Sequence, residues 1–199
     1  MKLVSLFFLL LGLNVFAEAP KRLIVLGDSL TEGYGVSKES AFPALLEVLI
    51  QKSGKNWVVI NAGISGSTTA SGPSRLQWQL KNKPDMMILA LGANDGLRGL
   101  PLKETEKNLA KTIELAQKDN VKVIIAGMLL PPNYGEVYRK QFSEMYETLA
   151  KKYKTPKIKF LLEGVAGNSK LNQADGVHPN EKGHEVVAEV VFKSIKDQL

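Results

Sequence analysis

The amino-acid sequence predicts an α/β fold in which helices cover both faces of a parallel sheet. Short apolar segments alternate along the chain with segments that have the 3.6-residue periodicity of helices. The short segments are mostly apolar on both faces, which is typical of buried parallel strands. Strands that alternate with helices form βαβ units with right-handed crossovers. In such sheets, ligands bind at the loops that follow the strands.

Five short apolar segments are predicted to be the strands, and each is expected to be buried on both faces. In chain order they span residues 23–26, 57–61, 86–91, 121–126 and 158–162. The loops that follow the first four strands contain the unusual glycine and polar residues; they span residues 27–35, 61–72, 92–99 and 127–135.

Helical patterns occupy residues 41–52, 102–118 and 136–153. The last helix is predicted after Pro179, with Asn180 as its N-cap. The first of these helices is expected to bury Leu45, Val48 and Leu49, and the last to bury Val186, Val187, Val190 and Val191.

The chain is predicted to hold one domain, over residues 18–199. Its 199 residues are 44% hydrophobic, which suits a single globular unit with its own core. No internal repeat, low-complexity segment or linker rich in Pro, Gly or Ser divides the sequence.

Residues 1–17 have the features of a secretory signal peptide. An early lysine precedes a short apolar run, and small residues stand near Ala17, where cleavage is expected. The run is shorter than the about 20 apolar residues that cross a bilayer; a retained anchor or a buried strand are the alternatives. The expected location is therefore periplasmic or secreted. The chain has no cysteine, which excludes a lipid-modified cysteine and any disulfide.

The charge pattern argues against nucleic-acid binding. The formal net charge is +6, and removal of residues 1–17, which hold one Lys and no acidic residue, lowers it to +5. The lysines are scattered along helical patterns rather than gathered with aromatic residues. Two histidines and no cysteine offer no convincing set of metal ligands, so neither a metal nor another cofactor is expected.

Ser29 and the pair Asp175 and His178 are candidates for nucleophilic catalysis. Ser29 lies in the segment Gly-Asp-Ser-Leu directly after the first strand, although these residue types also favour ordinary turns. A serine nucleophile needs a base and a group that orients the base. Three residues apart in a turn, Asp175 can accept a hydrogen bond from one imidazole nitrogen of His178 and leave the other free. Together these residues predict a serine hydrolase.

Two more loops could stabilise the negative charge that develops during acyl transfer. Asn94 follows the third strand, and its side-chain amide can donate to an oxyanion. Gly66 offers a backbone N–H that a substrate can approach closely, although taken alone this segment is better explained as a tight turn. The second histidine, His184, is expected to be solvated on the exposed side of the last helix.

Four ordered segments together resemble the SGNH (GDSL-type) hydrolase family: residues 27–35, 61–66, 91–99 and 175–180. The resemblance implies a three-layer αβα sandwich with a five-stranded parallel sheet, of the flavodoxin-like kind. It also implies that Ser29 is the nucleophile, His178 the base and Asp175 its orienting acid. The implied oxyanion donors are the backbone N–H groups of Ser29 and Gly66 and the side chain of Asn94.

The resemblance further implies hydrolysis of aryl esters, acyl-CoA thioesters and lysophospholipids through an acyl-enzyme, without a cofactor. The apolar loop over residues 128–135 would lie beside the acyl chain, while simple packing against a helix is its alternative. The expected enzyme is a monomer that touches membrane lipid at most transiently. Two other functions stay open: a carbohydrate acetylesterase on the same scaffold, and a non-catalytic binding protein.

Overall fold

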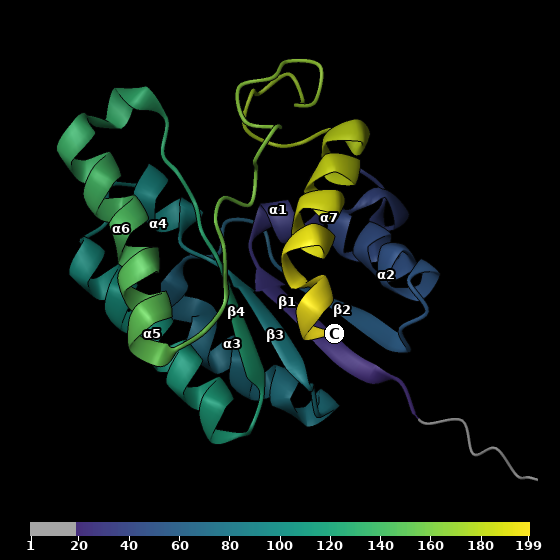
Figure 1. Cartoon of the computed structure of the whole chain (residues 1–199). Coiled ribbons are helices and arrows are strands. Elements are labelled where there is room, and N and C mark those ends of the chain that lie inside the picture. The colour runs from purple at the N-terminus through teal and green to yellow at the C-terminus, as the bar shows by residue number, and fades with distance from the viewer. Residues whose placement is uncertain (1–18) are drawn as a thin grey trace, which may run out of the picture.

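Five parallel strands form one sheet at the centre of the structure, a computed structural model that describes residues 19–199 (Figure 1). The predicted signal peptide, residues 1–17, lies outside the described residues. The strand order is β2-β1-β3-β4-β5. The strands are β1 (Lys21–Gly27), β2 (Trp57–Gly63), β3 (Met86–Ala90), β4 (Lys122–Ala126) and β5 (Lys157–Ile158).

Helices cover the sheet on both sides. In Figure 1, α2 and α7 lie on one side, and α3, α5 and α6 lie on the other. This arrangement confirms the predicted α/β sandwich of three layers with a five-stranded parallel sheet. The longer helices are α2 (Phe42–Lys52), α3 (Gly72–Gln79), α5 (Leu102–Lys118), α6 (Glu136–Tyr153) and α7 (Glu181–Ile195). The short helices α1 (Ser29–Glu32) and α4 (Ala93–Leu97) follow β1 and β3 directly. Single 3₁₀ turns span Lys38–Ser40, Thr69–Ser71, Leu80–Asn82, Pro132–Tyr134 and Lys196–Gln198.

The strand register brings the first and third βα loops together. Gly27, at the end of β1, is paired with Gly63 of β2 on one side and with Ala90 of β3 on the other. The carboxyl ends of these three strands therefore stop at the same level. The chain that follows β1 carries Ser29, and the chain that follows β3 carries Asn94, so both begin at one edge of the sheet.

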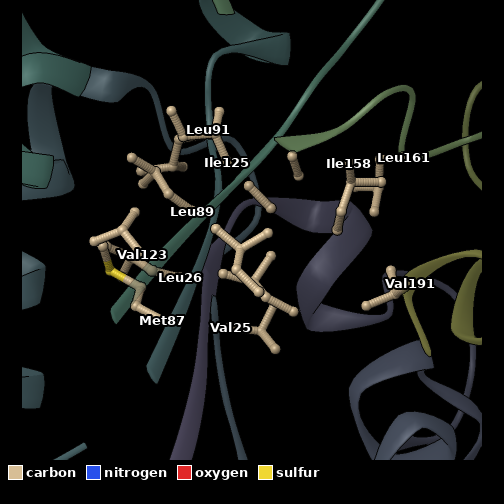
Figure 2. Packing of buried hydrophobic residues seen from close by; sticks show 14 of the residues in the cluster. Val25, Leu26, Met87, Leu89, Leu91, Val123, Ile125, Ile158, Leu161 and Val191 are labelled. Atoms are coloured by element: carbon tan, nitrogen blue, oxygen red, sulfur yellow. The ribbon is translucent and has the colours of Figure 1, made fainter. Parts of the chain in front are cut away.

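The hydrophobic core lies in two layers, one on each face of the sheet. All five residues of β3 are buried, as expected for a central strand with helices on both faces. Figure 2 shows Val191 of α7 and Ile158 on one side of the sheet, and Met87 and Val123 on the other. Burial of these apolar side chains stabilises the packing of the helices on the sheet, and this packing fixes the positions of the loops at the carboxyl ends of the strands.

Several details differ from the expectations. The segment at residues 57–61 is a strand but is not buried on both faces, because β2 lies at an edge of the sheet. At the other edge, only Lys157 and Ile158 form a strand. Helices α1 and α4 lie where loops were predicted, and α3 lies in a segment for which neither a helix nor a strand was predicted.

The inner faces of the helices are also partly different. Helix α2 buries Phe42, Pro43, Leu46 and Ile50, whereas Val48 is exposed. In α7, Val187 and Val191 are buried, whereas Val186 and Val190 are half-buried.

The prediction that His184 is solvated is wrong. The residue is 1% exposed in the structure, because α7 packs its His184 side against α2. The backbone N–H of Phe42 donates to His184 Nδ1 at 3.3 Å, and so His184 satisfies a donor in the first turn of α2, which has no capping side chain of its own. Nε2 of His184 is buried and has no hydrogen-bond partner within the described residues.

Among residues 19–199, none of the helices combines the length and the apolar character that crossing a membrane requires.

Candidate active site

Ser29 is presented by the turn that joins β1 to α1. Asp28 is the N-cap of α1, and its Oδ1 accepts a hydrogen bond from the Leu30 N–H at 3.1 Å. Ser29 is therefore the first residue of the helix, half-buried at the edge of the sheet. Asp28 itself is 1% exposed, and burial raises the pKa of its carboxyl to about 6.

The structure brings Ser29, His178 and Asp175 together in one hydrogen-bonded chain. Ser29 Oγ lies 2.9 Å from His178 Nε2, and His178 Nδ1 lies 2.6 Å from Asp175 Oδ2. The other carboxylate oxygen, Oδ1, accepts from the backbone N–H groups of Val177 (2.9 Å) and His178 (3.0 Å). These hydrogen bonds, foremost that from the His178 backbone, lower the pKa of Asp175 to about 2. The carboxylate is ionised at neutral pH and orients the imidazole toward Ser29.

Two residues that the sequence analysis did not single out support this turn. Gln173 Nε2 donates to the backbone oxygens of Tyr34 (2.6 Å) and Pro179 (2.9 Å), and the Gln173 N–H donates to the His178 oxygen at 2.7 Å. The Tyr34 ring lies 4.8 Å from the His178 ring, centroid to centroid. Gln173 is thus the link that holds the His178 turn against the loop after α1.

The predicted oxyanion donors lie on adjacent loops. Gly66 has a φ of 74°, a left-handed conformation that favours glycine. Within residues 19–199, the backbone N–H groups of Ser29 and Gly66 donate to no other group. Asn94 Nδ2 donates to the Ser67 oxygen at 3.0 Å and lies 3.5 Å from Asp28 Oδ2. Asn94 therefore connects the Gly66 loop with the turn that carries Ser29.

Asp95 and Arg98 fix the same loop but were not predicted. Asp95 is 2% exposed, and its two carboxylate oxygens accept from the N–H (2.9 Å) and the hydroxyl (2.6 Å) of Thr69. Arg98 Nη2 donates to the Gly66 oxygen at 3.1 Å. The sequence offered only one indication of these two roles, which was the polar loop after the third predicted strand. Within that loop, only the first polar residue, Asn94, has a well-known chemical role, that of an oxyanion donor.

Arg75 connects the carboxyl ends of β1 and β2. Its Nη2 donates to the Gly27 oxygen at 2.7 Å and also to the Ala62 oxygen. These carbonyls lie at the carboxyl ends of β1 and β2, so the guanidinium of Arg75 joins the two strand ends beside Asp28. This long-range contact had no signal in the sequence.

Ser29 opens into a largely apolar cavity of about 490 Å³. The loop after β4 forms one wall, and Leu130 in this loop is both packed into the core, at 4% exposure, and part of the cavity lining. Both interpretations of this loop, packing and cavity lining, thus hold in part. The apolar lining comprises Leu30, Leu97, Met128, Leu129, Leu130, Pro131, Pro132, Phe160, Leu162 and Val177.

The functional groups of the described residues define which chemistry the site can perform. In this part of the chain, no cluster of three His, Asp or Glu side chains could hold a metal ion. The site instead combines a serine, an imidazole fixed by an ionised carboxylate, and uncommitted backbone N–H groups. This arrangement can activate a hydroxyl and stabilise an oxyanion.

The chain is similar to several known esterases. The chain is 38% identical over 182 residues to esterase TesA of Pseudomonas aeruginosa, covering 91% of this chain and 90% of that protein. It is 37% identical over 191 residues to a thioesterase and lysophospholipase of Escherichia coli, covering 95% and 90%. The crystal structure of TesA matches 90% of this chain and 100% of its own, with a TM-score of 0.87 at 38% identity.

Residues 25–186 match the GDSL-like lipase/acylhydrolase family, and this match spans β1 through α7, including the loops described above. The chain therefore belongs to the GDSL-like lipase/acylhydrolase family and is a carboxylic ester hydrolase.

Proposed function

We propose that this chain hydrolyses acyl esters and thioesters through an acyl-enzyme formed on Ser29. The observation that carries the proposal is the hydrogen-bonded chain from Ser29 through His178 to Asp175, of which Ser29 and His178 line an apolar cavity. A half-buried serine at a helix start does not need these two partners for the stability of the fold, whereas a serine nucleophile requires both a base and a group that orients the base.

In the acylation step, His178 Nε2 takes the proton of Ser29 as Oγ attacks the carbonyl carbon. The carbonyl oxygen becomes an oxyanion, which accepts from the N–H groups of Ser29 and Gly66 and from Asn94 Nδ2. When the tetrahedral intermediate collapses, the bond to the leaving group breaks, and the alcohol or thiol leaves with the proton from His178. Asp175 stabilises the imidazolium that exists between these two events.

Water then repeats the sequence on the acyl-enzyme. His178 takes a proton from the water, the resulting hydroxide attacks the acyl carbon, and the Ser29 oxygen leaves with that proton. The product is the free carboxylic acid, and Ser29 is regenerated. This reaction scheme uses only the side chains and backbone groups named above, and it requires neither a metal nor an organic cofactor.

The cavity supports substrates with an aliphatic or aromatic acyl group. Its volume of about 490 Å³ lies within the range of small-molecule sites, and its lining is mainly apolar. The names of the relatives support the same classes, since they include an esterase, an arylesterase and a thioesterase with lysophospholipase activity. We propose aryl esters, acyl-CoA thioesters and lysophospholipids as substrates of a monomeric enzyme.

We further propose that residues 1–17 are a signal peptide and that residues 18–199 act as one domain in the periplasm or outside the cell. The apolar run after Lys2 and the small residues near Ala17 support this location. N-terminal sequencing of the protein expressed from the whole gene should find a start near residue 18. A mature protein that keeps Met1 would contradict the location.

Labelling with a fluorophosphonate probe tests the proposed nucleophile. The wild type should be labelled and should hydrolyse p-nitrophenyl esters, and Ser29→Ala should lose both properties while it keeps its melting temperature. Loss of a triad nucleophile typically costs several orders of magnitude in rate. Labelling or more than about 1% activity in Ser29→Ala would refute the assignment, and an unlabelled wild type would favour a non-catalytic binding protein.

A further inference from the structure

Arg139 is a charged residue in an otherwise apolar cavity wall, and the proposed mechanism gives it no role. It lies in the first turn of α6, is half-buried, and lines the cavity that opens at Ser29. Its Nε donates to the Leu130 oxygen at 2.9 Å. Because Leu130 is itself buried, this hydrogen bond fixes the guanidinium against the wall formed by the loop after β4.

The charge of Arg139 is not balanced by an acidic side chain. Within residues 19–199, no Asp or Glu forms an ion pair with it. Of the residues that line the cavity, it is the one arginine, and no lysine is among them; a guanidinium keeps its positive charge throughout the ordinary pH range. A guanidinium has five N–H donors, and the structure commits one of them. An unpaired charge beside apolar surface is unfavourable unless an anion accompanies it.

The position of Arg139 places such an anion away from the reacting ester. Leu130 follows β4, and the strand order puts β4 two strands from β1, which ends at Ser29. Two strand spacings amount to about 10 Å. The leaving group must remain near His178, which returns the proton to it. Leu130, which contacts Arg139, lines the cavity together with Phe160 and Leu162, and this apolar lining is the surface available to an acyl chain.

We infer that Arg139 selects substrates whose acyl chain carries a carboxylate remote from the ester. The planar guanidinium can donate two parallel hydrogen bonds to such a carboxylate, an arrangement that an ammonium cannot reproduce. The inference rests on the proposed function, because it assigns a part of the substrate to a part of the same cavity. It adds a charged specificity determinant to a cavity whose lining away from the reacting groups is mainly apolar.

The test compares two p-nitrophenyl esters of matched length: the neutral octanoate and the monoester of the eight-carbon dicarboxylic acid. The wild type should have the higher kcat/KM for the anionic ester. Arg139→Gln should lower the anionic-to-neutral ratio of kcat/KM about tenfold, the size of one charge-assisted hydrogen bond. Arg139→Lys should restore part of the ratio. The neighbouring Lys140, which is exposed and pairs with Glu144, gives the matched control Lys140→Gln, and this variant should leave the ratio unchanged.

Two further measurements distinguish a lost carboxylate contact from a general disturbance of the fold in Arg139→Gln. In the wild type, the ratio should fall between 20 mM and 500 mM salt, because salt screens a partly exposed ion pair. A third ester, the octanoate of a nitrophenol that carries a carboxylate on its ring, moves the anion to the leaving group, and Arg139→Gln should affect it less than the dicarboxylic monoester.

Several outcomes would overturn the inference. Equal kcat/KM values for both esters in the wild type, or a ratio that Arg139→Gln leaves unaltered, would show that Arg139 only holds Leu130. A larger effect on the leaving-group carboxylate would refute the placement on the acyl chain. In each of these cases hydrolysis of the neutral octanoate would leave the proposed function intact, whereas a wild type that hydrolyses none of the esters would refute both.

Discussion

Asp95 holds Thr69 by two hydrogen bonds, one to its backbone N–H at 2.9 Å and one to its hydroxyl at 2.6 Å, although 26 residues separate them in the chain. Asp95 directly follows Asn94, and Thr69 lies three residues after Gly66. The contact therefore joins the two loops that carry the proposed oxyanion donors. Since the rate gain from such donors depends on their prior orientation, this contact should matter for catalysis although neither Asp95 nor Thr69 lines the cavity at Ser29.

Thr69→Val should lower kcat with little change in KM, because it removes the hydroxyl that Asp95 binds and loosens the Gly66 loop. We expect a decrease of about tenfold, smaller than the roughly 10²-fold expected when Asn94→Ala removes a donor itself. Thr69→Ser keeps the hydroxyl and should restore kcat. Steady-state kinetics with p-nitrophenyl butyrate measures both parameters. An equal loss in the valine and serine variants, or an effect on KM alone, would assign Thr69 a role in packing or substrate binding.

Asp175→Asn should lower kcat by between about 10² and 10⁴, because an amide no longer fixes the tautomer and orientation of His178. The pKa of Asp175 is lowered to about 2, chiefly by the hydrogen bond from the His178 backbone, so its carboxylate stays ionised above about pH 3. Titration of Asp175 therefore cannot cause a loss of activity between pH 4 and 7. A pH–rate profile of the wild type and of Asp175→Asn tests this prediction. Unchanged rates in the variant would show that the hydrogen bond between Asp175 and His178 has only a structural role.

His184→Asn should change how stability depends on pH. Burial lowers the pKa of His184 to about 4, whereas an unfolded histidine titrates near 6.5. Between these values the unfolded chain binds the additional proton, so this residue makes the free energy of unfolding decrease as the pH falls from about 7 to 4. The contribution reaches about 3 kcal/mol at most. The asparagine keeps an acceptor for the Phe42 N–H but does not titrate, so the decrease should be smaller in the variant.

Urea unfolding of both proteins at several pH values measures this difference. The comparison is needed because Asp28 acts in the opposite direction: burial raises its pKa to about 6, and its contribution to stability is therefore lost as the pH rises from about 4 to 6. Asp28 is common to both proteins, so it cancels in the difference. Parallel curves for wild type and variant would show that His184 does not titrate in this range.

Leu130→Ser should reduce the preference for longer acyl chains. We expect the wild-type kcat/KM to rise from acetyl to octanoyl esters, since each buried methylene contributes up to about 0.8 kcal/mol. A polar side chain at this position of the cavity lining should make the increase of kcat/KM with acyl-chain length smaller. Val137, which is 71% exposed and does not line the cavity, provides the control Val137→Ser. A wild type that prefers acetyl to octanoyl esters would instead favour the carbohydrate acetylesterase.

The sequence by itself determined the fold class and indicated the candidate residues for the chemistry. Buried parallel strands need apolar residues on both faces, so strands such as β3 and β4 are visible as apolar runs in the chain. Asp175 and His178 are three residues apart, and a contact within one turn follows from local geometry alone. Ser29 and Asn94 are candidates because they stand in the loops after predicted strands, whose carboxyl ends meet at one edge of a parallel sheet.

Only the tertiary structure decided which groups support these residues. The strand order places β2 at an edge, where one face meets solvent, and no local pattern encodes that order. His184 is buried because α7 packs against α2, 142 residues away in the chain at their contact with Phe42. Asp95 accepts from the backbone N–H and the hydroxyl of Thr69, whereas Arg75 and Arg139 donate to backbone oxygens, and almost every residue offers such backbone groups. Such partners leave no signature in the sequence, because only the packed fold brings them within hydrogen-bonding distance.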